Sequence, residues 1–318
     1  MRILIALGGN ALLRRGEAMA YETELANVRK ASRQILSLCR NNEVIITHGN
    51  GPQVGLIALQ QEAFNDVAPY PLDAMGAQSI GLIGYMIQKE LTGLLGADSK
   101  IVSVLTQTEV LADDPAFDNP TKPVGPVYDK ATAEQLVKEH GWTMAVDNDH
   151  YRRVVASPDP QRILGLSALK TLIESGHLVI CCGGGGIPVY FDAEGKLIGA
   201  EAVIDKDLAS SLLASSLNTD LFIIATDVKG IYLNWSEAGQ KLIRQTSPSF
   251  LRQKSFAEGS MGPKVQAVCR FVEKTGRTAV IGSLEDINDL AQGHAGTLIG
   301  ADLETCFCFL EGIAHRKS

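Results

Sequence analysis

The stretch Leu178-Val-Ile-Cys-Cys-Gly-Gly-Gly-Gly-Ile-Pro188 runs from three apolar residues into four consecutive glycines shortly afterwards. The apolar run is typical of a buried strand. Glycine adopts positive φ angles and leaves its N–H groups open to a charged ligand, so successive glycine amides can converge on an anion. The stretch therefore predicts a buried strand whose C-terminal end opens onto a phosphate-binding loop.

Two further expected strands also end in glycine. Residues 3–7 lead into Gly8-Gly9-Asn10, and residues 44–47 lead into His48-Gly49-Asn50-Gly51. In an open α/β sheet the carboxyl ends of parallel strands line one crevice, and ligands bind there. We therefore expect the three glycine loops to share one binding site.

The composition is that of a globular enzyme. Of the 318 residues, 45% are hydrophobic and 20% are charged, and the length suits one large α/β domain or two lobes. The net charge of −7 argues against a nucleic-acid partner, because binding to a phosphate backbone needs a basic face. The apolar run before Gly8 is too short for a membrane span or a leader, and six scattered cysteines predict reduced thiols in the cytoplasm.

Alternating strand and helix patterns predict the parallel α/β class. Strands are expected at residues 3–7, 43–47, 101–106, 178–180, 221–226 and 278–281, and helices at 24–39, 78–95, 168–174, 207–217 and 263–275. Residues 112–160 are polar and punctuated by proline and glycine, which predicts an insertion that forms a small lid. Residues 301–318 form either a last edge strand or a loosely packed tail.

Three lysines lie in settings suited to phosphoryl chemistry, which needs positive charge around the transferred group. Lys206 lies between Asp205 and Asp207 at an expected helix start, where either acid can instead serve only as the helix cap. Lys264 follows a glycine-bearing loop at another helix start, and Lys122 lies between prolines in the insertion. Taken alone, Lys264 and Lys122 are also typical of solvated surface lysines.

Common nucleotide motifs are absent from the sequence. It contains no Gly-x-x-x-x-Gly-Lys-Ser/Thr loop, and no Gly-x-Gly-x-x-Gly follows an expected strand. His48 lies near the crevice, but hydrogen bonding to the backbone is favoured over a role as a general base. No histidine or cysteine has the spacing of a metal site, so metal ligands stay unassigned, and substrate phosphates and water can hold Mg²⁺.

The amino-acid sequence of these motifs resembles that of the carbamate kinase branch of the amino acid kinase family over almost the whole chain. Nine matching segments occur in order: Ile5-Ala-Leu-Gly-Gly-Asn-Ala-Leu12, Thr47-His-Gly-Asn-Gly-Pro-Gln-Val-Gly55, Asn119-Pro-Thr-Lys-Pro-Val-Gly-Pro126, Tyr151-Arg-Arg-Val-Val-Ala-Ser-Pro158, Gly183-Gly-Gly-Gly-Ile-Pro188, Glu201-Ala-Val-Ile-Asp-Lys-Asp-Leu208, Thr226-Asp227, Gly259-Ser-Met-Gly-Pro-Lys264 and Ala295-Gly-Thr297. Any one segment is a weak signal, but nine in the same order are specific.

The resemblance implies a three-layer αβα sandwich with an open, mainly parallel eight-stranded sheet. It also implies a homodimer and a single domain over residues 1–318, with a protruding subdomain near residues 112–160. The family's reaction is the reversible transfer of a phosphoryl group between carbamoyl phosphate and ADP, giving ATP and carbamate, with Mg²⁺. No general base is required, because the carbamate oxygen is already a nucleophile and catalysis reduces to positioning and charge neutralisation.

The same resemblance assigns the site residues. The small substrate and its phosphate are expected to contact Gly8, Gly9, Asn10, Gly49, Asn50 and Gly51. The expected catalytic residues are Lys122, Lys206, Asp207 and Lys264: Lys206 and Lys264 flank the transferred phosphoryl group, Asp207 orients both lysines, and Lys122 reaches in from the subdomain. The expected nucleotide-binding residues are Asp227, Tyr232 and Met261, together with Gly183 and Gly184 of the four-glycine loop.

The sequence departs from the family at three places. Asp147-Asn-Asp-His150 replaces an Ala-Gly-Arg-Gly-like turn, Lys229 stands where aspartate is usual, and the tail after Ile299 is longer. Two alternative functions stay open: a kinase of the same fold for another acid, such as acetylglutamate, aspartate or uridylate, and a catalytically silent sensor of carbamoyl phosphate or nucleotide. The source of carbamoyl phosphate, arginine fermentation or purine and allantoin breakdown, stays open too.

Overall fold

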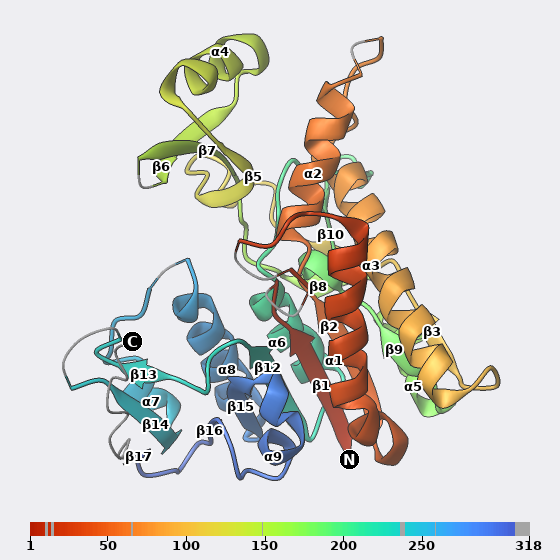
Figure 1. The fold of residues 1–318 in the computed structure, drawn as a ribbon, viewed down its shortest axis with the longest axis vertical. Helices are drawn as coiled ribbons and strands as arrows, with labels where there is room; N and C mark the ends of the chain where they lie inside the picture. The colour runs from red at the N-terminus through yellow and green to blue at the C-terminus, as the bar shows by residue number, and fades with distance from the viewer. Residues whose placement is uncertain are drawn as a thin grey trace, which may run out of the picture.

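The computed structural model describes residues 1–9, 12–13, 16–64, 66–147, 149–235, 239–257 and 259–308. A large mixed sheet lies between two layers of helices, and a small subdomain stands away from this main body (Figure 1). The predicted α/β class is confirmed.

The main sheet has ten strands in the described part of the chain. Their order is β13-β14-β16-β15-β12-β1-β2-β9-β3, and β17 pairs with β14. The strands are β1 (Arg2–Leu7), β2 (Glu43–His48), β3 (Ile101–Ser103), β9 (Leu178–Ile180), β12 (Leu221–Thr226), β13 (Tyr232–Leu233), β14 (Lys241–Thr246), β15 (Thr278–Ser283), β16 (Thr297–Ile299) and β17 (Cys306–Cys308). The six strands from β3 to β15 are parallel.

The expected number of eight strands is wrong for this chain. Two of the ten strands, β13 and β17, pair antiparallel with β14 at the end of the sheet. The segment from residue 301 therefore supplies an edge strand at Cys306–Cys308, whereas residues 309–318 lie outside the described residues. Short antiparallel additions of two or three residues carry too little hydrophobic pattern to be expected from sequence.

Seven of the helices cover the two faces of the main sheet. One face carries α1 (Tyr21–Asn41), α3 (Leu72–Leu95) and α9 (Ile287–Ala291); the other carries α5 (Leu166–Glu174), α6 (Lys206–Ser216), α7 (Pro248–Leu251) and α8 (Met261–Thr275). Strand side chains alternate between the faces, so that Ile3 and Ile5 pack toward α1 while Leu4 and Ala6 pack toward α6. Among the described helices, none has both the length and the apolar character that crossing a membrane requires.

Two smaller sheets extend the main body. The first has the order β11-β10-β4-β8 and comprises β4 (Gln107–Glu109), β8 (Arg162–Ile163), β10 (Ile187–Phe191) and β11 (Leu197–Gly199). The strand expected at 101–106 ends at Ser103, because the chain leaves the main sheet there to enter β4. The Thr106 carbonyl instead accepts a hydrogen bond from the Ile187 amide at 2.8 Å.

The second small sheet lies within the segment expected to be an insertion. It has the order β5-β7-β6, from β5 (Lys122–Tyr128), β6 (Thr143–Asp147) and β7 (His150–Val155), with α4 (Lys130–His140) beside it (Figure 1). Asp147 lies in the turn where the sequence departs from the family pattern. Its carboxylate forms an ion pair with the Arg152 guanidinium at 3.8 Å. This subdomain sits against α2 (Gly51–Glu62), the helix that follows the glycine loop of β2.

Candidate active site

Three of the strands that end in glycine are neighbours in the main sheet. β1 pairs with β2 and β2 with β9, all parallel, so their carboxyl ends lie along one edge. The backbone continues the ladder past the strands, since the Gly49 amide donates to the Leu7 carbonyl at 3.2 Å. A Cβ on Gly9 or Gly51 would meet no atom within 4 Å, which leaves space at this edge. The predicted placement of the three strand ends at one edge of the sheet is confirmed.

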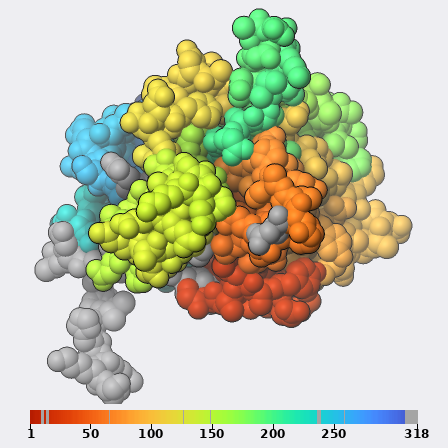
Figure 2. Space-filling model, turned by 90° about the horizontal axis from the view of Figure 1, so that it is seen from above, coloured from red at the N-terminus to blue at the C-terminus, as the bar shows by residue number. Residues whose placement is uncertain are grey.

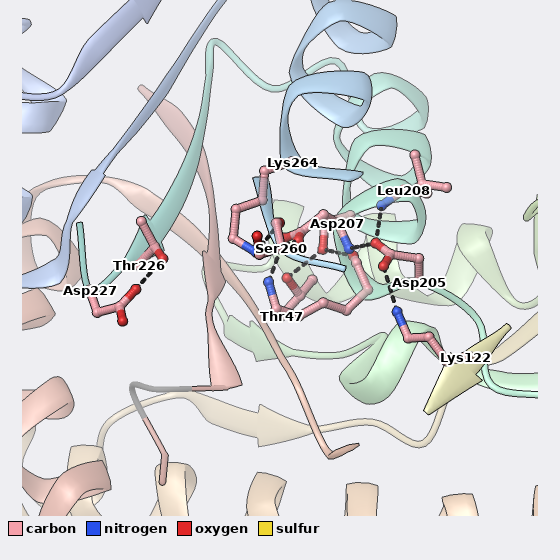
Figure 3. A network of polar contacts seen from close by, with 11 residues as sticks. Thr47, Lys122, Asp205, Asp207, Leu208, Thr226, Asp227, Ser260 and Lys264 are labelled. Atoms are coloured by element: carbon pink, nitrogen blue, oxygen red, sulfur yellow. Dashed lines mark hydrogen bonds and ion pairs between the residues drawn. The ribbon is translucent and has the colours of Figure 1, made fainter. Parts of the chain in front are cut away.

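Helix α6 begins at the crevice with a capped and charged first turn. The Asp205 carboxylate caps it by accepting from the amides of Asp207 at 2.9 Å and Leu208 at 3.3 Å. The other oxygen of Asp205, Oδ2, lies 2.7 Å from Lys122 Nζ (Figure 3). One carboxylate therefore joins the helix that carries Lys206 to the lysine of the subdomain.

Lys206 and Lys264 converge on one carboxylate from two different helices. Lys206 Nζ binds Asp207 Oδ1, and Lys264 Nζ, from the first turn of α8, lies 3.2 Å from Asp207 Oδ2 (Figure 3). The Lys264 side chain is only 18% exposed, so its alternative interpretation as a solvated lysine is wrong. The helix N-termini of α6 and α8 meet at the same place and add partial positive charge.

The electrostatics keep this cluster charged. Burial acts to raise the pKa of Asp207, but the two ammonium groups beside it outweigh burial and bring the pKa down to about 2. Burial lowers the pKa of Lys206, and the attraction of Asp207 partly opposes that shift. Asp207 is therefore ionised at neutral pH, and the two lysines around it leave an excess of positive charge for an anion.

A pair of buried hydroxyls fixes α6 to β2. Thr47 Oγ1 lies 2.7 Å from Ser210 Oγ, and Ser210 Oγ donates to the Lys206 carbonyl at 2.6 Å. Both side chains are fully buried. This pair is not expected from the sequence; its local signal is a serine four residues after Lys206, one helical turn away.

The four-glycine loop is built differently from the expectation. Gly183–Gly185 form a short 3₁₀ turn, and the glycines are buried rather than open. A Cβ on Gly183 would lie 2.3 Å from the His48 ring, and one on Gly184 would lie 2.4 Å from the Asn50 amide group. Glycine is needed here because neighbouring side chains already press against the backbone. This loop is also separated from β12 by β1 and β2, so contact of Gly183 and Gly184 with a nucleotide remains a prediction.

His48 and Asn50 both turn into the protein. His48 Nδ1 lies 2.9 Å from the Gly49 carbonyl, and burial lowers the pKa of the imidazole to about 4. The predicted backbone-bonded histidine is confirmed, and it is neutral at pH 7. Asn50 Nδ2 donates to Ser79 Oγ at 2.9 Å, so the Asn50 side chain ties the loop after β2 to α3. Asn10, expected at the substrate, lies outside the described residues.

The residues expected beside the nucleotide lie on the other side of β1. Asp227 follows β12 and accepts a hydrogen bond from Thr226 Oγ1 at 3.0 Å (Figure 3). Tyr232 lies on β13, with its ring 5.1 Å from that of Trp235, and Met261 is the first residue of α8. These three residues are thus set around the end of the sheet that is remote from β9.

A dedicated metal cage is not evident in the described residues. They contain no group of three or more histidine, cysteine, aspartate or glutamate side chains suited to one ion. The two carboxylates at the crevice, Asp205 and Asp207, are each engaged with lysine ammonium groups. A hard cation such as Mg²⁺ can nevertheless bind through substrate phosphates and water.

Known proteins match this chain closely. A model of the amino acid kinase family matches residues 1–283. The chain is 56% identical over 299 residues to the carbamate kinase of Haemophilus influenzae, covering 94% of this chain and 96% of that protein. It is 46% identical over 310 residues to the carbamate kinase of Pyrococcus furiosus, with 94% and 98% covered. The carbamate kinase from Giardia lamblia bound to AMP-PNP superposes with a TM-score of 0.87 at 40% identity, over 95% of this chain and 98% of that one.

Proposed function

The chain belongs to the amino acid kinase family, and we propose that it catalyses reversible phosphoryl transfer between carbamoyl phosphate and ADP, giving ATP and carbamate. The observation that carries this proposal is the convergence of Lys206 and Lys264 on the buried Asp207 carboxylate, at the edge where β1 and β2 end in glycine. The similarity to carbamate kinases supports the choice of substrate.

The reaction exchanges one oxygen–phosphorus bond for another. A terminal β-phosphate oxygen of ADP attacks the phosphorus of carbamoyl phosphate, and the bond from phosphorus to the carbamate oxygen breaks with its electron pair. Carbamate leaves as an anion, so no proton needs to move in the step. The protein has to hold the two anions in line and neutralise the charge on the phosphoryl oxygens between them.

Lys206 and Lys264 are suited to that neutralisation. Each ammonium group keeps donor capacity beyond its bond to Asp207, because a lysine has three N–H donors. Asp207 holds both groups in place before substrate arrives, which avoids reorganisation during the reaction. Lys122 adds a third positive charge from the subdomain, on the side where Asp205 anchors it.

The substrates are proposed to lie on the two halves of the crevice. Carbamoyl phosphate is held by the loops after β1 and β2, at Gly8, Gly9, Asn10, Gly49, Asn50 and Gly51, with Asn50 contributing through its backbone because its side chain is bonded to Ser79. ADP lies toward β12, β13 and α8, at Asp227, Tyr232 and Met261. The open space at Gly9 and Gly51 supports the first placement. Mg²⁺ would be held mainly by phosphate oxygens of the nucleotide, where it would offset their charge.

We also propose that residues 1–318 form one amino acid kinase domain with a subdomain near 112–160, and that the protein is a cytoplasmic homodimer. Exposed Tyr21, Leu82 and Tyr85 on the adjoining helices α1 and α3 offer apolar surface that a second copy can cover. Cysteines that are free in the described structure, such as Cys39 and Cys269, suit a reducing compartment.

The direct test is a coupled ATP assay with ADP, Mg²⁺ and carbamoyl phosphate. ATP should form faster than carbamoyl phosphate decomposes without protein, and ATP formation should depend on Mg²⁺. If no ATP forms above the background measured without protein, the proposal is wrong. In the reverse direction, incubation with ATP and acetylglutamate, aspartate or UMP tests the alternative kinases. Binding of carbamoyl phosphate with no turnover would instead indicate a sensor.

A further inference from the structure

The subdomain touches the main body through a backbone crossing of two glycines. Gly55 lies on the second turn of α2, and Gly125 lies on β5. A Cβ on Gly55 would lie 2.4 Å from the Cα and 2.6 Å from the amide nitrogen of Gly125, whereas Cβ contacts under 3.0 Å essentially never occur. The two backbones are therefore as close as they can come.

Each of the crossing elements begins at the crevice. α2 starts at Gly51, in the loop proposed to bind carbamoyl phosphate, and β5 starts at Lys122. The crossing thus lies four residues from the substrate loop along one element and three residues from the subdomain lysine along the other. The subdomain lies beside α2 when the molecule is viewed from the side and from above (Figures 1 and 2).

The shape of β5 depends on Gly125. Its φ angle of +72° lies in the left-handed region, and the register with β7 shifts between Val124 and Val127. The Gly125 carbonyl accepts a hydrogen bond from Arg152 Nε at 2.8 Å, which holds the bend in place. β5 therefore bends at the crossing, with Lys122 on the side of the main body and Tyr128 on the side of α4.

We infer that Gly55 and Gly125 form a seat that sets how far Lys122 reaches toward the transferred phosphoryl group. In this role both glycines are positioning residues, acting through Lys122, and the inference rests on the proposed phosphoryl transfer. The apolar contacts around the seat, from Val54 and Leu72 to Val124, hold the subdomain on α2. The glycines determine the separation, because no side chain stands between the two backbones.

Substitution of Gly55 by alanine gives a sharp prediction. The atoms that the new methyl group meets belong to the backbone of Gly125 and cannot rotate away, so β5 has to move outward. The outward movement of β5 at Gly125 occurs only three residues from Lys122. It removes Lys122 Nζ from its 2.7 Å contact with Asp205. The charge of Lys122 would then be out of place for the substrate, although Lys206 and Asp207 on α6 stay where they are.

The experiment compares Gly55→Ala with Gly93→Ala, each alone and combined with Lys122→Ala. Gly93 is an exposed glycine of α3 whose added Cβ would meet no atom within 4 Å, so it is a matched control. Gly55→Ala should lower kcat/KM for carbamoyl phosphate by up to about tenfold, because displacing the Lys122 ammonium group cannot cost more than removing it. The ADP dissociation constant should not change, and Gly93→Ala should resemble the unsubstituted protein.

The double variant decides whether the effect passes through the lysine. In the Lys122→Ala background, Gly55→Ala should cause little further loss, because the lysine that it displaces is already gone. A full additional loss would overturn the inference. So would a parallel loss of ADP binding or of thermal stability, since both would indicate general damage to the fold.

A second readout does not depend on turnover. Acetylation of lysines, followed by mass spectrometry, measures how accessible each Nζ is. Lys122 should react faster in Gly55→Ala than in the unsubstituted protein, while the exposed Lys274 of α8 should react equally in both. Equal rates for Lys122 would contradict the seat. If the protein made no ATP but Lys122 became more reactive, the seat would stand and the proposed reaction would fall.

Discussion

The positive charges at the crevice are held in two different ways. Lys206 and Lys264 come from helices packed on the main sheet and share the buried carboxylate of Asp207. Lys122 comes from a separate three-stranded sheet, is 32% exposed, and reaches the crevice through its bond to Asp205. The main body therefore holds the charges of Lys206 and Lys264 in fixed positions, whereas the position of the Lys122 charge depends on how the subdomain packs on α2.

The largest effect is expected from Asp207→Asn, which breaks the permanent cluster. Both lysines lose their shared partner, so kcat should fall by about 10³-fold. Lys206 would be left buried without its opposing charge, and its already lowered pKa should fall further. Part of the lost kcat should therefore return as the pH is lowered, since a lower pH restores the proton on Lys206. A pH profile parallel to that of the unsubstituted protein would contradict this reading of the cluster.

Lys264→Ala sharpens the comparison by removing only one permanent charge. We expect kcat to fall by about 10²-fold at saturating substrate, with folding retained, because one preorganised electrostatic contact is lost. Lys206→Ala should lose at least as much. Lys254→Ala, at an exposed site that packs on Phe250, serves as the control and should keep its kcat. Near-normal turnover in either crevice variant would remove that lysine from the catalytic set.

Lys122→Ala should have a smaller and more selective effect. We expect kcat/KM for carbamoyl phosphate to fall by about tenfold, while the ADP dissociation constant and the thermal midpoint stay nearly constant. The selectivity follows because Lys122 belongs to the substrate side of the crevice and its side chain lies outside the main core. Equal losses for both substrates would erase the distinction between the two kinds of lysine.

The smallest effect on catalysis is expected from His48→Gln, a substitution within the main body. This substitution should instead change how the stability of the folded state depends on pH. The folded pKa of His48, about 4, is below the ordinary value of 6.5, so the folded state is favoured above pH 6.5 and loses stability as the pH falls toward 4. The loss should approach 1.4 kcal/mol per pH unit, roughly one proton taken up on unfolding. Urea titrations of His48→Gln should show a shallower dependence over this range, and kcat at pH 7.5 should change little.

The parts of the fold that follow from local pattern could be predicted from the sequence. Apolar runs that end in glycine marked β1, β2 and β9 and the crevice that they share. Helical spacing marked α6 and α8, although their first residues lie one or two positions earlier than expected. The cap at Asp205 and the lysines at those helix starts are local signals that the sequence shows, and the structure brings Lys206 and Lys264 together on Asp207.

The rest depends on contacts between distant segments. Lys122 and Asp205 are 83 residues apart, and Thr47 and Ser210 are 163 apart, so no spacing rule joins them. The open surface expected at the four glycines is wrong for the same reason. The glycine run predicts an open surface. In the structure His48 and Asn50, at the end of β2, fill the space beside Gly183 and Gly184. Packing of this kind is decided only when the chain is folded.

Asp205 narrows the range of residues that evolution can accept at its position. One of its oxygens caps α6 through two backbone amides, and the other binds the ammonium group of Lys122. Asparagine would keep the cap but lose the charge, and glutamate would keep the charge on a side chain too long for the usual cap. Substitutions at Asp205 should therefore be selected against for two separate reasons: the loss of the α6 cap and the loss of the contact with the subdomain. This selection does not require Asp205 to touch the reacting atoms.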